Sequence, residues 1–468
     1  MASMESTQGP RWSSNLVFVL ASAGAAVGLG NLWRFPYIAG ENGGGAFVLV
    51  YIAAVILIGY PIMVAELTIG RRGRGNAEQA IRAISRESGI DKTWTVTGMF
   101  QKAVPIGHWQ VIGLLSIFIP FVGIAYYSVI AGWVLDYMVA FIGSGGLNYD
   151  DPEGFQQRFE DMMGSPWRLL ALHAAFMAGV IFVTAHEIHS GIERAARFLM
   201  PALFVLLLIL VGFAFMQGDM ARGVNFLFAP DFSALTWRGV LLAVGQAFFS
   251  LAVGIGALMT FGAYLDKATS LPKAAAQICA TDTAVALLAG LAIFPIVFAF
   301  GLDPQEGPGL TFVTLPNAFA EMTGGYIVGS AFFLLLFFAA FTTGIATLEP
   351  VVSWLIGRGM ARKPAALLSG GAAWILGAVA ALSFNEWEDV HPLAFLGWDA
   401  HIFDILDFSI ASLLLPVNGL LIAIFVAWAI RRHAIDDELG GPNAFLSVWR
   451  IVLGIAAPIA IVAILAMG

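Results

Sequence analysis

The chain has 468 residues, of which 59% are hydrophobic and 12% are charged, and its mean hydropathy is +0.84. A soluble domain averages roughly 45–50% apolar and about 25% charged residues, so this composition excludes a fold whose whole surface faces water. The formal net charge is −8, and the single cysteine, Cys279, excludes an intrachain disulfide and a cysteine-based metal cluster. We expect a lipid bilayer as the solvent and no nucleic-acid partner.

Residues 1–15 are predicted to be a cytoplasmic amino-terminal segment. The stretch from Met1 to Arg11 is polar, lacks the cluster of positive charges that opens a signal peptide, and runs into glycine-rich sequence without a small-residue cleavage site. We therefore expect the first apolar span to be retained.

Apolar runs of about 18 or more residues recur along the whole chain, each long enough to cross a hydrocarbon core of about 30 Å as a helix. The sequence therefore predicts an all-α integral membrane protein with about eleven transmembrane helices. These helices are expected at 16–37, 46–70, 105–142, 167–187, 191–216, 237–266, 272–301, 326–357, 364–384, 403–431 and 444–467.

Basic residues fall on alternate connections between these spans. Seven of them lie between the second and third spans, and Arg431 and Arg432 follow the tenth, whereas intervening connections are acidic, as at Asp150 and Asp151. The positive-inside rule then places the amino terminus in the cytoplasm, and an odd number of spans places Gly468 outside. We expect a multi-pass protein of a bacterial inner membrane.

Two connections are longer than a link between helices needs, 143–167 and 302–325. Long ordered loops are often lids, and a variable surface loop is the alternative for the first. The second contains prolines and an apolar stretch around 312–319, which favours short helices or a re-entrant hairpin.

Glycines interrupt two of the spans at mid-membrane depth. The first span carries three glycines and a proline within 22–36, and the sixth carries three glycines within 245–256. A break there leaves backbone groups unpaired at several kcal/mol each unless protein or bound ions satisfy them. Breaks that open each half predict two inverted five-helix repeats, 16–216 and 237–431, with a site at their interface and one further helix at 444–468. Close helix packing through glycine is the alternative.

Four motifs resemble the neurotransmitter:sodium symporter family, the group of the bacterial leucine transporter, over almost the entire chain. They are Gly28-Leu-Gly-Asn-Leu-Trp-Arg-Phe-Pro36, Glu41-Asn-Gly-Gly-Gly-Ala-Phe47, Gly245-Gln-Ala-Phe-Phe-Ser-Leu251, and the pair Gly191 and Pro201 with nine residues between them. The resemblance implies a sodium-coupled transporter that works by alternating access and is not an enzyme.

The resemblance also implies two sodium sites. The first would use the Ala26 carbonyl, the Asn31 and Ser250 side chains and Asp282, where many relatives have asparagine. Oxygen ligands of this kind suit a hard cation. The second would use the carbonyls of Gly24, Val27 and Ala339 and the hydroxyls of Thr342 and Thr343. Hydrogen bonds from the two threonines to carbonyls of their own helix are the alternative.

A small amino acid is the substrate that the resemblance implies. Its carboxylate would meet the amides near Leu29 and Gly30 at a half-helix amino end, and the Tyr127 hydroxyl. The lining for its side chain is small at Gly123 and Ala252 and otherwise largely apolar, which favours a large hydrophobic or aromatic amino acid. The complete predicted substrate site is Ala26, Gly28, Leu29, Gly30, Gly123, Tyr127, Phe249, Ser250, Ala252, Ile255 and Thr347.

Gates are expected on both sides of this site. Arg34 and Asp407 match the family's outer pair, which would close through water, and a static salt bridge is the alternative. On the inner side Trp12 and Tyr264 are expected to close the mouth. The usual arginine–aspartate pair is in doubt there, because the arginine is displaced to Arg11 and no aspartate ends the eighth span.

Chloride is not expected to be required. Tyr51, Gln246 and Ser250 match the family's chloride ligands, but the fourth position is Ala286. Asp282 already supplies a negative charge beside the first sodium site, so a chloride there would be redundant or repelled.

A sodium:amino-acid symporter is therefore the leading hypothesis. A membrane receptor or regulator with the same fold, which binds an amino acid without transport, is the alternative. A transporter driven by protons alone would leave Asn31, Ser250 and the two threonines without a common purpose. An intramembrane enzyme lacks a catalytic constellation at bilayer depth.

Overall fold

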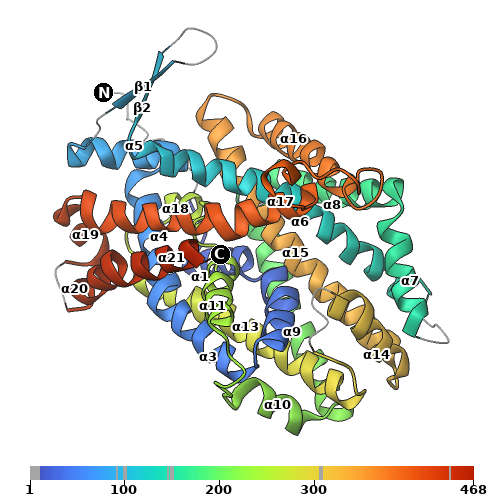
Figure 1. The fold of residues 1–468 in the computed structure, drawn as a ribbon. Helices are drawn as coiled ribbons and strands as arrows, with labels where there is room; N and C mark the ends of the chain where they lie inside the picture. Colours follow the sequence, from blue (N-terminus) through green and yellow to red (C-terminus); the bar gives the residue numbers. More distant parts are fainter. Residues whose placement is uncertain are drawn as a thin grey trace.

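A computed structural model describes residues 11–90, 93–97, 103–144, 147, 152–304, 309–441 and 444–467. The predicted all-α membrane fold is confirmed, with one two-stranded ribbon in addition. Within the described ranges nine helices are long and apolar enough to span a membrane, and a bent pair formed by the first two helices makes ten. The helices Trp237–Ser250 and Ala257–Ala263 would add an eleventh span if they are counted as one interrupted helix. The total of eleven transmembrane helices stays a prediction. Figure 1 shows the bundle.

The first half of the chain forms the following elements, where η denotes π-helical and 3-10 stretches. They are α1 (Asn15–Ala26), η1 (Gly30–Arg34), α2 (Phe35–Glu41), α3 (Gly45–Ala54), η2 (Val55–Gly59), α4 (Tyr60–Gly73), α5 (Ala77–Ser88), β1 (Thr93–Thr97), β2 (Ala103–Gly107), α6 (Gln110–Ser144), α7 (Pro152–Met163), α8 (Pro166–Thr184), α9 (Ile192–Gln217) and α10 (Met220–Phe228).

The second half continues in the same style. Its elements are α11 (Trp237–Ser250), α12 (Ala257–Ala263), α13 (Leu271–Ala299), η3 (Leu310–Thr314), α14 (Leu315–Glu321), α15 (Gly325–Gly357), α16 (Arg362–Leu382), η4 (Ala394–Leu396), α17 (Ile402–Asp407), η5 (Phe408–Leu414), α18 (Leu415–Ile424), η6 (Phe425–Ala429), α19 (Arg432–Leu439), α20 (Ala444–Ile451), η7 (Val452–Ala456) and α21 (Ala457–Met467).

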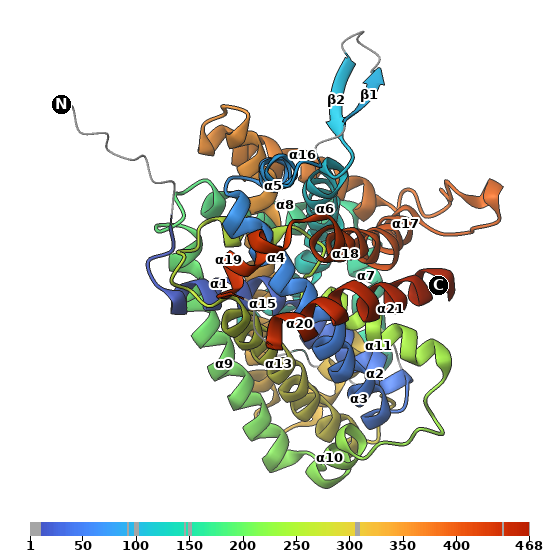
Figure 2. The same ribbon diagram turned by 90° about the vertical axis from the view of Figure 1, so that its left-hand side faces the viewer.

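The third span begins at Gln110 and not at 105, because 103–107 pairs antiparallel with 93–97 as a β-ribbon. Figures 1 and 2 show this ribbon projecting from one end of the molecule, with α10 at the opposite end. Four short helices, α5, α7, α10 and α19, lie in connections where no helix was expected. The ends of α5 are marked in the sequence. Asn76 and Gln79 form a capping box at its start, and Gly89 ends the helix in the left-handed region.

Both long connections contain helical structure. The first holds α7, and the second holds η3 and α14, as the apolar stretch around 312–319 predicted. Residues 145–146, 148–151 and 305–308 lie outside the described residues, as do residues 1–10 of the predicted amino-terminal segment and Gly468. Whether either connection acts as a lid stays a prediction.

The two predicted breaks are present. Helix α1 ends at Ala26, and the chain resumes at Gly30 after a bend of 52°. Six residues, 251–256, separate α11 from α12, and three of them have positive φ: Ala252 at 50°, Gly254 at 86° and Gly256 at 85°. This backbone is costly for a residue with a side chain, so the strain at Ala252 marks the segment as one that its surroundings hold in place.

Neighbouring helices hold the second break through Gly254. The Gly254 amide donates to Glu66 Oε1 on α4 at 2.5 Å, and the Gly254 carbonyl accepts from Asn418 Nδ2 on α18 at 2.7 Å. Asn418 Nδ2 also donates to Ser116 Oγ on α6 at 3.0 Å. Since all three side chains are buried, the backbone groups of Gly254 are satisfied by side chains from two helices, and Ser116 on a third helix holds Asn418 in place.

Replacing Gly254 by alanine is expected to unfold this segment. A Cβ there would lie 2.6 Å from the Leu415 carbonyl oxygen, and φ is 86°. The left-handed conformation alone costs about 1–2 kcal/mol for an L-residue, and the clash adds to it. We expect a loss of at least 5 °C in the melting temperature of the purified protein.

Gly245→Ala is the matched control, because a Cβ at Gly245 on the preceding helix has no neighbour within 4 Å. Equal melting temperatures for Gly254→Ala and Gly245→Ala would contradict the account of the break.

Candidate binding site

A small central cavity lies where the two breaks meet α6, α15 and the junction of η5 with α18. Its volume is about 50 Å³. All the predicted substrate residues except Ser250 line it. The full lining is Ala25, Ala26, Gly28, Leu29, Gly30, Gly123, Tyr126, Tyr127, Phe249, Ala252, Ile255, Thr343, Thr347, Ile410 and Leu415.

Sequence reasoning missed five of these residues: Ala25, Tyr126, Thr343, Ile410 and Leu415. Thr343 had been assigned to a sodium site only. The mid-span position of Tyr126 beside Tyr127 was a signal for Tyr126, and no signal pointed to the other three. Ile410 and Leu415 are apolar residues in a largely apolar span, so their own side chains give no sign of which residues face the cavity.

Two glycines let the first break approach its neighbours. A Cβ at Gly28 would lie 2.6 Å from Thr343 Oγ1, and a Cβ at Gly30 would lie 2.9 Å from the Phe249 ring. The Leu29 amide donates to the Tyr127 hydroxyl oxygen at 3.4 Å. The hydrogen of that hydroxyl can therefore be donated to another acceptor in the cavity.

Beside the cavity, Asn31, Ser250 and Asp282 form a closed polar network. Asn31 Nδ2 donates to Ser250 Oγ at 2.9 Å and to Asp282 Oδ1 at 2.8 Å. Ser250 Oγ donates to Asp282 Oδ2 at 2.7 Å, and the Tyr51 hydroxyl donates to the same oxygen at 3.1 Å. The structure thus brings together residues from α13 and from both breaks.

The Asp282 carboxylate is completely buried, and its partners are neutral donors. No basic side chain lies within 4.0 Å of it among the described ion pairs. A buried carboxylate is expensive unless a cation compensates it. This donor set has one carboxylate, so a monovalent cation would balance its charge and a divalent one would leave an excess positive charge.

Gln246 and Ala286 occupy the remaining positions that correspond to the family's chloride ligands. Gln246 Nε2 donates to the Gly30 carbonyl at 2.7 Å, which ties α11 to the first break. Ala286 is buried on α13, one turn beyond Asp282, and supplies no donor.

The second predicted ion site is assembled in part. Thr343 Oγ1 lies 3.2 Å from the Gly24 carbonyl oxygen and 3.3 Å from that of Val27, across the gap between α15 and α1. Thr342 Oγ1 instead donates to carbonyls of its own helix, including Ala339 at 3.1 Å. Back-bonding is thus the observed contact of Thr342, whereas Thr343 reaches the broken helix.

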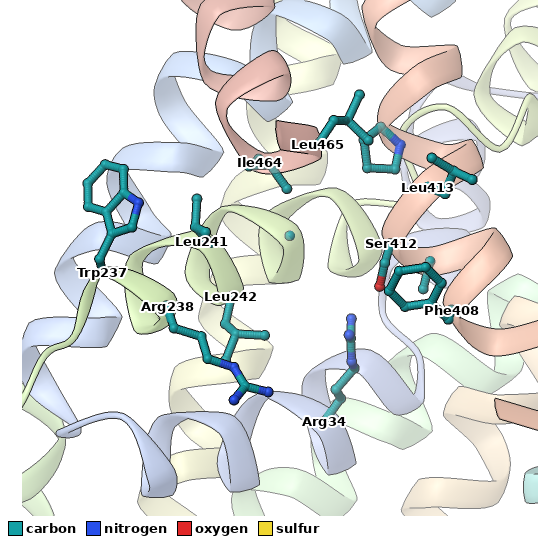
Figure 3. A pocket seen from close by; sticks show the side chains of 13 residues that line it. Arg34, Trp237, Arg238, Leu241, Leu242, Phe408, Ser412, Leu413, Ile464 and Leu465 are labelled. Carbon is teal, nitrogen blue, oxygen red and sulfur yellow. The ribbon is translucent and has the colours of Figure 1, made fainter. Parts of the chain in front are cut away.

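A larger cavity of about 650 Å³ lies between α11, η5 and α21, and Arg34 lines it. Figure 3 shows it bordered by Trp237 and Leu241, by Phe408 and Ser412, and by Ile464 and Leu465. The Arg34 guanidinium carbon lies 4.7 Å from the centre of the Phe249 ring, and Phe249 lines the central cavity. Arg34 and Phe249 therefore stand between the two cavities.

Arg34 and Asp407 do not touch in the described structure, since no pair of their charged atoms comes within 4.0 Å. Asp407 lies near enough to Arg34 and to the Tyr126 hydroxyl for an electrostatic interaction with each. The static salt bridge is therefore not formed, which leaves room for closure through water.

On the other side of the central cavity, Trp12 packs against a group of aromatic side chains. The Trp12 indole N–H donates to the Phe261 carbonyl at 2.9 Å, and the Trp12 ring packs against Tyr264 with ring centres 6.1 Å apart. Arg11 pairs with Asp266 at 2.9 Å, and both side chains are about half exposed.

A buried ion pair that sequence reasoning missed lies next to Tyr264. Arg362 donates to both Glu349 oxygens, at 3.0 and 2.6 Å, and the Tyr264 hydroxyl donates to Glu349 Oε1 at 3.4 Å. Glu349 is completely buried in α15. Its charge inside an apolar span was the signal that could have identified it.

The chain is similar to a family model and to several known proteins. The family model described as the sodium:neurotransmitter symporter family matches residues 9–145 and 154–467. The uncharacterized sodium-dependent transporter YhdH of Bacillus subtilis is 36% identical over 97% of this chain and 96% of its own length.

The descriptions of two further similar proteins mention an amino acid. The crystal structure of MhsT in complex with L-phenylalanine superposes with a TM-score of 0.86 at 39% identity, over 98% of this chain and 99% of that one. The sodium-dependent nutrient amino acid transporter 1 of Drosophila grimshawi is 27% identical over 75% of this chain and 60% of its own length.

Proposed function

The chain belongs to the sodium:neurotransmitter symporter family, a family of sodium-coupled transporters and not of enzymes, and we propose that it couples uptake of an amino acid to sodium. The observation that carries this proposal is the buried Asp282 carboxylate, held by Asn31 and Ser250 between the two broken helices. A cation at that point balances the charge and satisfies oxygens that the breaks leave unpaired.

The first sodium ion would be held by Asp282, the Asn31 and Ser250 side chains and the Ala26 carbonyl. Rotation of the Asn31 amide exchanges its nitrogen for its oxygen, which would then face the ion. A second sodium ion would be held by the Gly24, Val27 and Ala339 carbonyls with Thr343. The Thr342 hydroxyl would join them after it releases its own helix.

We assign the α-carboxylate of the substrate to the amides of Leu29 and Gly30 and to the Tyr127 hydroxyl. Support comes from the Tyr127 hydrogen, which is not used by Leu29, and from the position of both amides at the start of η1. A carboxylate there lies next to the first sodium site, so ion and substrate stabilise one another.

The side chain of the substrate would enter the apolar part of the lining, between Gly123, Ala252 and Ile255. Because two of these residues are small, we propose a hydrophobic or aromatic amino acid. The L-phenylalanine in the MhsT complex supports this class. A cavity of about 50 Å³ must widen to hold such a side chain, which fits a site that opens and closes.

Alternating access would use two gates. Arg34, Phe249 and Asp407 would separate the site from the larger cavity on the outer side, and Trp12 and Tyr264, backed by Glu349 and Arg362, would close the inner side. This arrangement assumes the repeats 16–216 and 237–431, a cytoplasmic amino terminus and a carboxyl terminus outside a bacterial inner membrane.

We further propose that chloride is not required. Asp282 already places a negative charge against Tyr51 and Ser250, the groups that would donate to a chloride ion. A second anion in the same buried network would be repelled.

A binding screen tests the substrate class directly. Purified protein is titrated with each of the twenty amino acids in sodium and in potassium, with tryptophan fluorescence or scintillation proximity as the readout. We expect hydrophobic and aromatic amino acids to bind in sodium at least tenfold more tightly than in potassium. Equal binding in both salts would contradict sodium coupling.

A further inference from the structure

The tenth predicted span contains an irregular turn beside the central cavity. Residues 408–414 are π-helical, and the Leu415 amide donates to the carbonyl of Ile410, five residues earlier. Pro416 follows directly, and it supplies no amide hydrogen and crowds the carbonyl four residues before it. The wider turn avoids that clash.

This turn brings Ile410 and Leu415 to one side of the helix. In a regular α-helix, residues five apart differ by about 140° around the axis and point to different sides. The wider turn here reduces that separation, and both residues line the central cavity while being 2% and 3% exposed. π-Helical turns of this kind often occur at functional sites.

Ile410 faces Gly123 on α6. A Cβ built at Gly123 would meet Ile410 Cγ2 at 4.0 Å and no other atom within that distance. The two positions therefore share one space. Where α6 contributes no side chain, the isoleucine from the π-helical turn forms the wall.

We infer that Ile410 determines which substrate side chains fit, and that positions 410 and 123 together set the upper limit of side-chain size. The inference rests on the proposed function, because it concerns the same cavity. Removing bulk at 410 enlarges the space for the substrate, whereas adding bulk at 123 fills it. A change at one position should compensate a change at the other.

The test measures sodium-driven uptake in proteoliposomes and compares Vmax/KM for tryptophan with that for valine. We expect Ile410→Ala to raise the tryptophan-to-valine ratio at least tenfold, since one or two methylenes in an apolar pocket change selectivity by about that much. Ile410→Val should raise it less, and Gly123→Val should lower it. The double variant Gly123→Val/Ile410→Ala should return to within threefold of the wild-type ratio.

Ile422→Ala is the matched control, because Ile422 is equally buried on α18 and is not part of the cavity lining. It should leave the ratio unchanged even if it lowers the amount of folded protein. Unchanged ratios in Ile410→Ala and Ile410→Val, or a double variant no closer to wild type than Gly123→Val, would overturn the inference. A wild-type chain that accumulates no amino acid would instead overturn the proposed function.

Discussion

Replacing Asp282 by asparagine is expected to reduce sodium-driven uptake in chloride-free medium by roughly 100-fold. The substitution keeps the shape of the side chain but removes the only negative charge in the buried network of Asn31, Ser250 and Tyr51. Hydrogen bonds and contacts to a buried charge contribute about 1.5–3 kcal/mol, which corresponds to one to two orders of magnitude in affinity for the ion. The measurement is initial uptake at fixed sodium in proteoliposomes.

The anion dependence makes this experiment specific. In the wild-type protein, exchange of chloride for gluconate should leave uptake unchanged. In Asp282→Asn, chloride should restore part of the lost uptake, because an external anion can take the place of the missing charge. Asp437→Asn, an exposed carboxylate on α19, is the control and should behave like wild type. Wild-type uptake that needs chloride, or Asp282→Asn uptake that ignores it, would contradict the proposal.

Glu349→Gln is expected to open the inner side of the site. The change leaves the Arg362 guanidinium without its carboxylate partner in a buried setting, where loss of one member of an ion pair costs about 3–5 kcal/mol. The Tyr264 hydroxyl loses the same partner. Since the pair backs Trp12 and Tyr264, we expect the closed inner arrangement to lose population by roughly 100-fold or more.

Cysteine labelling measures this opening. Cys279→Ser removes the native thiol, and Ala263→Cys places a reporter at the end of α12, where it is buried. A water-soluble methanethiosulfonate reagent should label the reporter at least tenfold faster in the presence of Glu349→Gln. Glu87→Gln, which removes a more exposed carboxylate partner of Arg72, should not change the rate. Equal labelling in both backgrounds would mean that the pair does not hold the inner side closed.

Much of the site could be predicted because it is built from residue types that are unusual inside a membrane span. Glycines in the middle of apolar spans predicted a break, with close helix packing as the alternative, and Asn31, Ser250 and Asp282 are polar where polarity is costly. The structure brings these three together within hydrogen-bonding distance. Their roles as sodium ligands stay a prediction.

Other parts could not be predicted for physical reasons. Ile410 and Leu415 are apolar residues in an apolar span, so hydropathy says nothing of which face they occupy. Their common orientation depends on a π-helical turn before Pro416, and α-helical periodicity gives the wrong face for one of them. Nothing in the sequence pairs Arg362 with Glu349, because only the packing of α16 against α15 brings the two side chains together.

The most direct test of the account is uptake of radiolabelled phenylalanine into proteoliposomes with an inward sodium gradient, compared with equal sodium or potassium on both sides. The account predicts accumulation above the external concentration with the gradient, collapse of that accumulation on addition of a sodium ionophore, and no dependence on chloride. Binding of hydrophobic amino acids without accumulation of any of them under a sodium gradient would contradict it, and would identify the chain as a receptor with a transporter fold.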